Sequence, residues 1–309
     1  MASHSAIVLA LTPAAPRPLS ARVSAVLADF WSLTKPEINF LVLIATFAGF
    51  YLGSRAQIQG PQLLLLIRTL LGTLLVAGGA GTLNQYFERE FDARMRRTSR
   101  RPLPSGRVKP SLALAYGILL AVSGCMCLAV GVNGLAALLA VATLAGYLAF
   151  YTPLKRKTAL CTLAGAIPGA MPPLIGWAAA SGNLTYSAWL LFFTLFLWQF
   201  PHFMAIAWMY REDYTRAGYR VLPHCKADQL MFWQTLLPSA VLIPVTMSQP
   251  MIAGAAPVYI VIAGILSYAF FCCSAPLAFR KSKVAARRAL LASILYLPLI
   301  FIAILLGKR

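Results

Sequence analysis

The sequence contains very few acidic residues and few charged residues of either sign. Only 8 of its 309 residues are Asp or Glu, and charged residues make up 11% of the chain, against about a quarter in soluble globular proteins. This excludes an ordinary soluble domain. The mean hydropathy is +0.73, and apolar runs of about 17–25 residues, long enough to cross a bilayer as a helix, recur along the chain. The sequence therefore predicts an all-α, polytopic membrane protein.

Paired cysteines and long polar linkers are also lacking. The six cysteines form no C-x-x-C pair, and most lie inside apolar runs, so we interpret them as small hydrophobic residues rather than as disulfides or metal ligands. No polar stretch separates one half of the chain from the other. We expect a mobile cytosolic arm at 1–33, followed by a single membrane domain at 34–309.

Nine membrane spans are expected. Their approximate ranges are 38–54, 62–83, 112–131, 134–152, 160–180, 186–209, 230–248, 255–277 and 288–306. With the N-terminus in the cytosol, nearly all 27 basic residues fall on the cytosolic side, as the positive-inside rule requires. The exceptions are Arg55, Arg68, Lys308 and Arg309. The net charge of +19 is thereby explained by topology and by contact with anionic lipid, and not by nucleic acid.

The fifth span is interrupted by proline and glycine. Its centre reads Pro168-Gly169-Ala170-Met171-Pro172-Pro173. Backbone groups freed by such a break need protein or a cavity around them. We therefore expect this span to face the interior of the bundle.

The scarce acids are concentrated at the end of the second span. Asn84, Glu88 and Asp92 recur every four residues, which on a helix places them on one stripe at ~6 Å per step. Their oxygen atoms suit Mg²⁺. Arg97, Arg100 and Arg101 follow closely, and arginine is suited to bidentate phosphate contact. A metal ion with arginines is what a diphosphate leaving group needs.

An ordinary helix end is the alternative, with its acids paired to arginines four residues away, such as Glu90 with Arg94. Ionisable residues at a membrane boundary are costly and tend to be functional. The concentration of acids here therefore favours a metal and phosphate site.

Asn84-x-x-x-Glu88-x-x-x-Asp92 resembles the first aspartate-rich motif of the UbiA-type intramembrane prenyltransferases. Its extension, Met95-x-Arg97-Thr98-x-x-Arg101-Pro102-Leu103, resembles the branch that farnesylates protohaem IX. Other blocks match in the same order: Thr34-Lys35-Pro36, Tyr151-Thr152-Pro153-Leu154-Lys155-Arg156, Gly169-Ala170-Met171-Pro172-Pro173-Leu174-Ile175-Gly176, Trp198-Gln199-Phe200-Pro201-His202-Phe203, Asp213-Tyr214-x-x-Ala217-Gly218 and Leu222-Pro223.

This resemblance implies a bundle of nine transmembrane helices with an active-site cavity on the cytosolic side, capped by residues 84–110 and 210–229. The implied reaction is transfer of a farnesyl group from farnesyl diphosphate to a vinyl group of haem b, with Mg²⁺ as cofactor, in the cell inner membrane. A haem A synthase or an oxidase-assembly protein is an implied partner. Prenylation of an aromatic quinone precursor and membrane transport remain the alternative functions.

The resemblance also assigns roles to ten residues. It assigns Mg²⁺ binding to Asn84, Glu88 and Asp92, and catalysis to these three residues together with Asp213. It assigns diphosphate binding to Arg97, Arg101, Lys155 and Arg156. It assigns haem binding to His202 and Tyr214. Other interpretations stay open for several of them. His202 is either a haem axial ligand or a packed core residue, Asp213 either holds metal or pairs with a nearby arginine, and Lys155 and Arg156 could be ordinary loop charges.

The chain departs from the family pattern at two points. Glu88 stands where the family often has Asp. A second motif of the D-x-x-x-D kind is missing, because the acids beyond Asp92 are only Glu212, Asp213 and Asp228. This absence leaves open how a second Mg²⁺ would be held, and it distinguishes the chain from quinone prenyltransferases.

Overall fold

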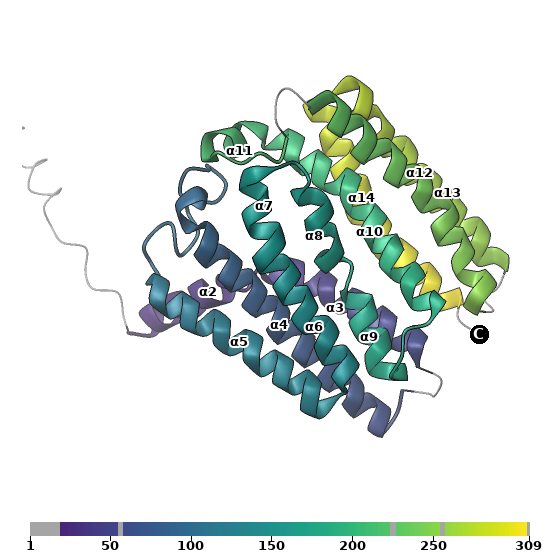
Figure 1. Cartoon of the computed structure of the whole chain (residues 1–309), viewed down its shortest axis with the longest axis horizontal. Helices are drawn as coiled ribbons and strands as arrows, with labels where there is room; N and C mark the ends of the chain where they lie inside the picture. The colour runs from purple at the N-terminus through teal and green to yellow at the C-terminus, as the bar shows by residue number, and fades with distance from the viewer. Residues whose placement is uncertain (1–18, 55–57, 223–226, 254–256, 308–309) are drawn as a thin grey trace, which may run out of the picture.

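The computed structural model describes residues 19–54, 58–222, 227–253 and 257–307, and these form helices joined by loops (Figure 1). The elements are α2 (Leu19–Leu33), α3 (Pro36–Gly53), α4 (Pro61–Asp92), α5 (Pro110–Gly131), α6 (Gly134–Ala145), η1 (Gly146–Tyr151), α7 (Thr152–Lys157), α8 (Cys161–Gly169), α9 (Pro172–Ser181), α10 (Tyr186–Met209), α11 (Arg211–Ala217), α12 (Ala227–Ala253), α13 (Pro257–Arg280) and α14 (Lys283–Gly307).

Nine spans within the described residues are long and apolar enough to cross a membrane: α3, α4, α5, α6–η1–α7, α8–α9, α10, α12, α13 and α14. The predicted all-α class and the predicted number of spans are confirmed. Large apolar side chains such as Leu119, Leu138 and Leu295 are exposed on the spans, as expected where the neighbour is lipid rather than water.

The fifth span is broken as predicted, and it lies in the interior of the bundle. Helix α8 ends at Gly169, and α9 begins at Pro172. Small residues bring α9 close to α3, since a Cβ added to Gly176 would lie 1.9 Å from the carbonyl oxygen of Thr46. Close backbone approach at small residues is the usual way in which membrane helices pack.

Helix α4 carries the acidic stripe without a break. It runs for 32 residues from Pro61 to Asp92, so Asn84, Glu88 and Asp92 belong to the same helix as the second span. Helix α5 packs along it at glycines, where a Cβ on Gly79 would meet the backbone nitrogen of Ala121 at 2.7 Å. The stripe is therefore fixed on a rigid, closely packed element.

Two groups of helices flank α10. In Figure 1, α12, α13 and α14 lie along one side of the bundle and α4, α5 and α6 along the other. Hydrogen bonds join the first group internally, from Thr246 Oγ1 to Ser267 Oγ at 2.8 Å and from Ser267 Oγ to Tyr296 Oη at 3.0 Å. Such side-chain bonds between helices stabilise packing in lipid.

One end of the bundle collects most of the charge. The C-terminal end of α4, residues 93–109, α7 and α11 all lie there (Figure 1), and we call it the basic end. The two segments predicted to cap the site meet at this end, because the Arg97 guanidinium lies 4.9 Å from the ring centre of Tyr210.

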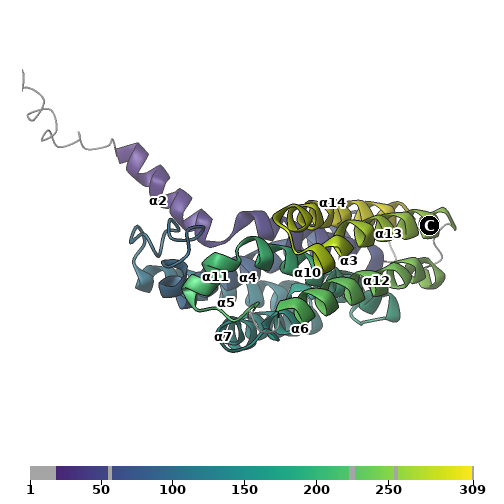
Figure 2. The same cartoon turned by 90° about the horizontal axis from the view of Figure 1, so that it is seen from above.

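Helix α2 leaves the bundle obliquely, as Figure 2 shows. Its last turn is tied to α4, since Gln85 Nε2 donates to the carbonyl oxygen of Leu33 at 3.0 Å. The second half of the arm expected at 1–33 is thus helical. Residues 1–18 lie outside the described part of the chain, as do Pro223 and His224, so the mobility expected of the arm stays a prediction.

Candidate active site

The predicted stripe is buried. Asn84, Glu88 and Asp92 are 1%, 2% and 1% exposed and lie in the last turns of α4 at the basic end. Two carboxylates that are almost fully buried are costly unless they are compensated by positive charge. The surroundings of the stripe supply that charge.

A basic side chain from outside α4 contacts each stripe residue. The contacts join Lys35 Nζ to Asn84 Oδ1 at 2.6 Å, Lys155 Nζ to both carboxylate oxygens of Glu88 at 3.1 Å, and Arg101 Nη1 to Asp92 Oδ2 at 2.7 Å. The start of α3, the fourth span and the loop after α4 therefore converge on one line of oxygen atoms. The sequence assigned Lys155 and Arg101 to diphosphate, and the structure places both at the stripe.

Lys35 is a site residue that the sequence did not assign. It precedes Pro36 in a left-handed backbone conformation, with φ 57° and ψ 62°. The residue as a whole is partly exposed, but burial of its ammonium group and the nearby Arg101 lower the pKa of Lys35 to about 7. Thr34-Lys35-Pro36 was one of the matched blocks, and the lysine within it was the available signal.

The amide of Asn84 is oriented by Thr152. Asn84 Nδ2 donates to Thr152 Oγ1 at 3.2 Å, and Thr152 Oγ1 donates to the carbonyl oxygen of Tyr147 at 2.9 Å. Because the amide nitrogen is engaged there, Oδ1 faces Lys35. Thr152 follows the π-helical turn η1, and such turns occur frequently at functional sites.

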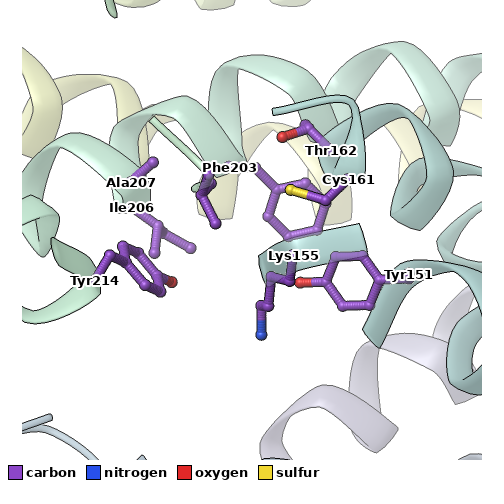
Figure 3. A pocket seen from close by; sticks show the side chains of 9 residues that line it. Tyr151, Lys155, Cys161, Thr162, Phe203, Ile206, Ala207 and Tyr214 are labelled. Carbon is purple, nitrogen blue, oxygen red and sulfur yellow. The ribbon is translucent and has the colours of Figure 1, made fainter. Parts of the chain in front are cut away.

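Aromatic rings surround Lys155. Its Nζ lies 5.1 Å from the ring centres of both Tyr151 and Tyr219, a distance at which a cation is attracted to the ring face. A pocket opens beside it (Figure 3), lined by Tyr151, Lys155, Cys161, Thr162, Phe203, Ile206, Ala207, Tyr214 and Val221. Tyr214, assigned to haem by the sequence, thus shares a pocket with Lys155. The hydroxyls of Tyr151 and Tyr214 point into the space around the lysine.

Arg97 and Arg156 make no hydrogen bond or ion pair with the stripe among the described residues. Arg97 is exposed and lies against Tyr210. Arg156 Nη2 donates to the carbonyl oxygen of Phe87 at 2.9 Å, and its guanidinium lies 4.0 Å from the ring centre of Phe91. Both lie at the basic end, where their predicted role toward diphosphate stays a prediction.

His202 faces α14 and not the stripe. Its Nδ1 lies 2.8 Å from Ser293 Oγ, and its ring stacks on Trp198 at 4.8 Å. Ser293 Oγ also lies within hydrogen-bond distance of the carbonyl oxygen of Leu290, at 2.6 Å. When the serine hydroxyl donates to that carbonyl, it accepts from Nδ1 of the ring. In that tautomer the lone pair of the neutral imidazole is on Nε2, where it can bind a metal.

Asp213 is paired locally. Its Oδ1 lies 3.5 Å from Arg216 Nη1, three residues along α11. This is the ordinary pairing considered above, and no contact joins Asp213 to the stripe among the described residues. Among the described residues, neither Asp213, which the resemblance assigned to catalysis, nor His202, which it assigned to haem, has a contact with the stripe.

The residues of the stripe fit a magnesium ion. Glu88 and Asp92 offer carboxylate oxygens and Asn84 an amide oxygen, and Mg²⁺ commonly uses one or two carboxylates and completes its shell with water and substrate phosphates. Within the described residues, no group of three or more His, Cys, Asp or Glu side chains is placed to hold a metal. A bound ion would therefore depend on substrate oxygens for part of its shell.

Comparison with known proteins defines the class. The profile of the UbiA prenyltransferase family matches residues 42–305, so the chain belongs to that family and is a prenyltransferase. Solved structures share the fold: a chain from work on digeranylgeranylglyceryl phosphate synthase matches with a TM-score of 0.73 and 18% identity, over 91% of this chain and 98% of the other. An Archaeoglobus fulgidus UbiA homolog bound to GPP and Mg²⁺ has a TM-score of 0.63 and 15% identity, over 89% and 99%.

Three relatives with higher sequence identity than these solved structures are each named protoheme IX farnesyltransferase. The one from Solibacter usitatus is 45% identical over 91% of this chain and 98% of its own, and the one from Koribacter versatilis is 38% identical over 96% and 97%. The relative from Salinibacter ruber is 43% identical over 87% and 95%. The resemblance seen in the sequence is confirmed.

Proposed function

We propose that this protein transfers a farnesyl group from farnesyl diphosphate to a vinyl group of protohaem IX (haem b), giving haem O and diphosphate. One observation carries the proposal: the chain is 45% identical, over 98% of the relative's length, to a protein named for this reaction. The buried stripe with its convergent basic residues supports it. That geometry is suited to a leaving group with high negative charge.

The stripe and the basic residues that contact it stabilise diphosphate as the leaving group. Mg²⁺ held by Asn84, Glu88 and Asp92 would supply the electrostatic stabilisation that the leaving group needs. Arg101 contacts Asp92, and Lys155 contacts Glu88. In this proposal both donate to the phosphate oxygens, and the arginine is suited to a bidentate contact. Preorganised donors of this kind stabilise charge as it develops.

The pocket beside Lys155 receives the prenyl carbon. Loss of diphosphate leaves an allylic cation, which the vinyl carbon of haem attacks, and water then adds to the resulting carbocation to give the hydroxyl of the product. The aromatic residues Tyr151, Phe203 and Tyr214 line this pocket, and aromatic rings attract a cation that approaches their faces. A vinyl group needs no general base to attack, which agrees with a chain that has eight acids in all.

His202 contacts haem through Nε2 in this proposal. In the tautomer that donates from Nδ1 to Ser293 Oγ, Nε2 keeps its lone pair, and it has no protein partner among the described residues. Imidazole is a common axial ligand of haem iron. Asp213 and Arg216 then act at the rim of the basic end rather than as a second metal site.

The environment of the reaction is a membrane. We infer that the membrane is the cell inner membrane with the N-terminus in the cytosol, which the distribution of basic residues supports. A haem A synthase or an oxidase-assembly protein fits as a partner, since the product is an apolar haem. Transport is no longer a competing function, because the family consists of prenyltransferases.

Labelled farnesyl diphosphate tests the reaction. Membranes containing the protein should incorporate the label into haem when haem b is supplied, and mass spectrometry should identify haem O. An aromatic quinone precursor offered in parallel should stay unlabelled. Label in the quinone precursor and none in haem would overturn the proposal and favour the alternative acceptor.

A further inference from the structure

Helix α2 has an exposed apolar face. The side chains of this face, Val23, Val26, Leu27 and Trp31, are each more than half exposed. They stand at positions i, i+3, i+4 and i+8, which places them on one side of the helix. An apolar patch of this kind marks a surface that contacts lipid or another protein.

The same side of the helix packs on the bundle at its C-terminal end. Phe30 lies four residues after Val26, and its ring contacts Tyr116 of α5 edge to face, with ring centres 5.1 Å apart. Leu33, three residues further along, is fully buried in the apolar cluster that contains Leu103. Because positions three and four apart share a helix face, the exposed first turns face the side on which the spans lie.

The other side of α2 is polar and contacts the loop after α4. Both carboxylate oxygens of Asp29 accept from Arg107 Nε, at 3.0 Å and 3.1 Å. Arg107 also donates through Nη1 to the carbonyl oxygen of Arg100 at 3.1 Å. The helix is therefore fixed in rotation, with its polar side toward this loop and its apolar face turned away from it.

Helix α2 is too short to cross a membrane. Its 15 residues extend ~22 Å at ~1.5 Å per residue, whereas the hydrocarbon core of a bilayer is about 30 Å thick. It leaves the bundle obliquely (Figure 2), and only Thr34 and Lys35 separate it from α3. A short amphipathic helix beside a span lies in the plane of the membrane interface.

The neighbouring residues indicate lipid, and not a protein, as the partner of this face. The chain passes from α2 directly into the first span, where Ile38 and Phe40 are exposed. Trp31 lies in the last turn before that span, and tryptophan is enriched at the membrane–water interface. The first 28 residues contain two arginines and no acidic residue, which suits the negative surface of a membrane.

We propose that α2 lies along the bilayer surface at the basic end, with Val23, Val26, Leu27 and Trp31 inserted among the lipid headgroups and the adjoining acyl carbons. Phospholipid is then the partner of the apolar face. The helix gives the protein a contact with the membrane surface in addition to its spans. This contact is independent of the reaction that the protein catalyses.

Photocrosslinking in native membranes identifies the molecule that covers the face. The photoreactive amino acid p-benzoylphenylalanine, placed at Leu27 of the full-length protein, should form phospholipid adducts, detected by mass spectrometry of the labelled peptide. The same amino acid at Ala25, which is exposed on the other side of the helix, should form few. A protein as the main product at Leu27, or as little lipid adduct there as at Ala25, would overturn the proposal.

Trypsin tests whether the apolar face holds the helix on the membrane. With the protein in lipid nanodiscs, Val26→Glu combined with Leu27→Glu should speed cleavage after Arg22 at least ~10-fold, because two apolar side chains lose their burial in lipid. The matched control, Ala25→Glu combined with Ala28→Glu, adds the same charge on the other side of the helix and should be cleaved at the wild-type rate. Equal rates in the two double variants would refute the proposal.

Discussion

Replacing Asp92 by Asn removes one charge from the stripe with almost no change in shape. Asp92 is 1% exposed and accepts a bond of 2.7 Å from Arg101. The substitution takes away one of two charged ligands for the cation. It also removes the negative charge that pairs with Arg101.

The expected loss is large for activity and modest for stability. Removing one preorganised group that stabilises developing charge typically lowers kcat about 10²–10³-fold, or about 2.7–4 kcal/mol. The ion pair itself contributes about 1.5 kcal/mol, at the low end for a charged hydrogen bond, because the Arg101 side chain is 28% exposed and can turn to water. The variant should therefore fold and insert normally.

The assay is haem extracted from membranes of a host that lacks its own enzyme. Asp92→Asn should leave haem b with about 1% or less of the wild-type haem O, on the magnitude above. Glu90→Gln is the matched control: it lies two residues away, removes the same charge and is 72% exposed, so its haem O should equal that of the wild type. Normal haem O in Asp92→Asn, or an equal loss in Glu90→Gln, would refute the assignment of the stripe.

Three further substitutions test other parts of the account. Lys155→Met leaves the buried Glu88 carboxylate unpaired and should lower the free energy of unfolding by about 3–5 kcal/mol, measured by thermal unfolding in detergent, together with loss of haem O. Ser293→Ala removes the hydrogen-bond partner of His202 Nδ1, and should weaken haem binding in a spectroscopic titration about tenfold, in line with other residues that orient a metal ligand. Gly176→Ala places a Cβ 1.9 Å from a backbone oxygen of α3 and should destabilise the bundle by about 1–3 kcal/mol.

Controls on the same elements separate these effects from general damage. Lys157→Met should keep wild-type stability, since Lys157 is exposed on the same helix as Lys155. Ser239→Ala removes a serine that bonds only within α12 and should leave the haem titration unchanged. Gly134→Ala, where an added Cβ meets nothing within 4 Å, should unfold like the wild type. Equal effects in a test variant and its control would contradict the corresponding assignment.

Local pattern was enough to predict the spans and the stripe. Apolar runs of span length and the break at Pro168–Pro173 depend only on the chain near them. The four-residue spacing from Asn84 to Asp92 needs only that α4 continue past the second span, and it does. Arg101 and Lys155, which the resemblance assigned to diphosphate, contact Asp92 and Glu88, and their role toward diphosphate stays a prediction.

Tertiary packing decides which residues contact Asn84, Glu88 and Asp92, and the four-residue spacing of the motif does not reveal them. Lys35 and Thr152 reach Asn84 across 49 and 68 positions, and no periodicity links them. Arg156 follows Lys155 directly, yet it points to the backbone of Phe87. His202 was assigned to haem by the resemblance, and its orientation toward Ser293 is set by how α10 packs on α14.

The most direct test of the central claim is the haem content of a host without its own enzyme, determined by mass spectrometry after expression of the wild-type chain. We expect haem O, carrying the hydroxyethyl-farnesyl group, and we expect it to disappear when farnesyl diphosphate synthesis is blocked. Haem b alone, in membranes that contain the folded protein together with both substrates, would contradict it.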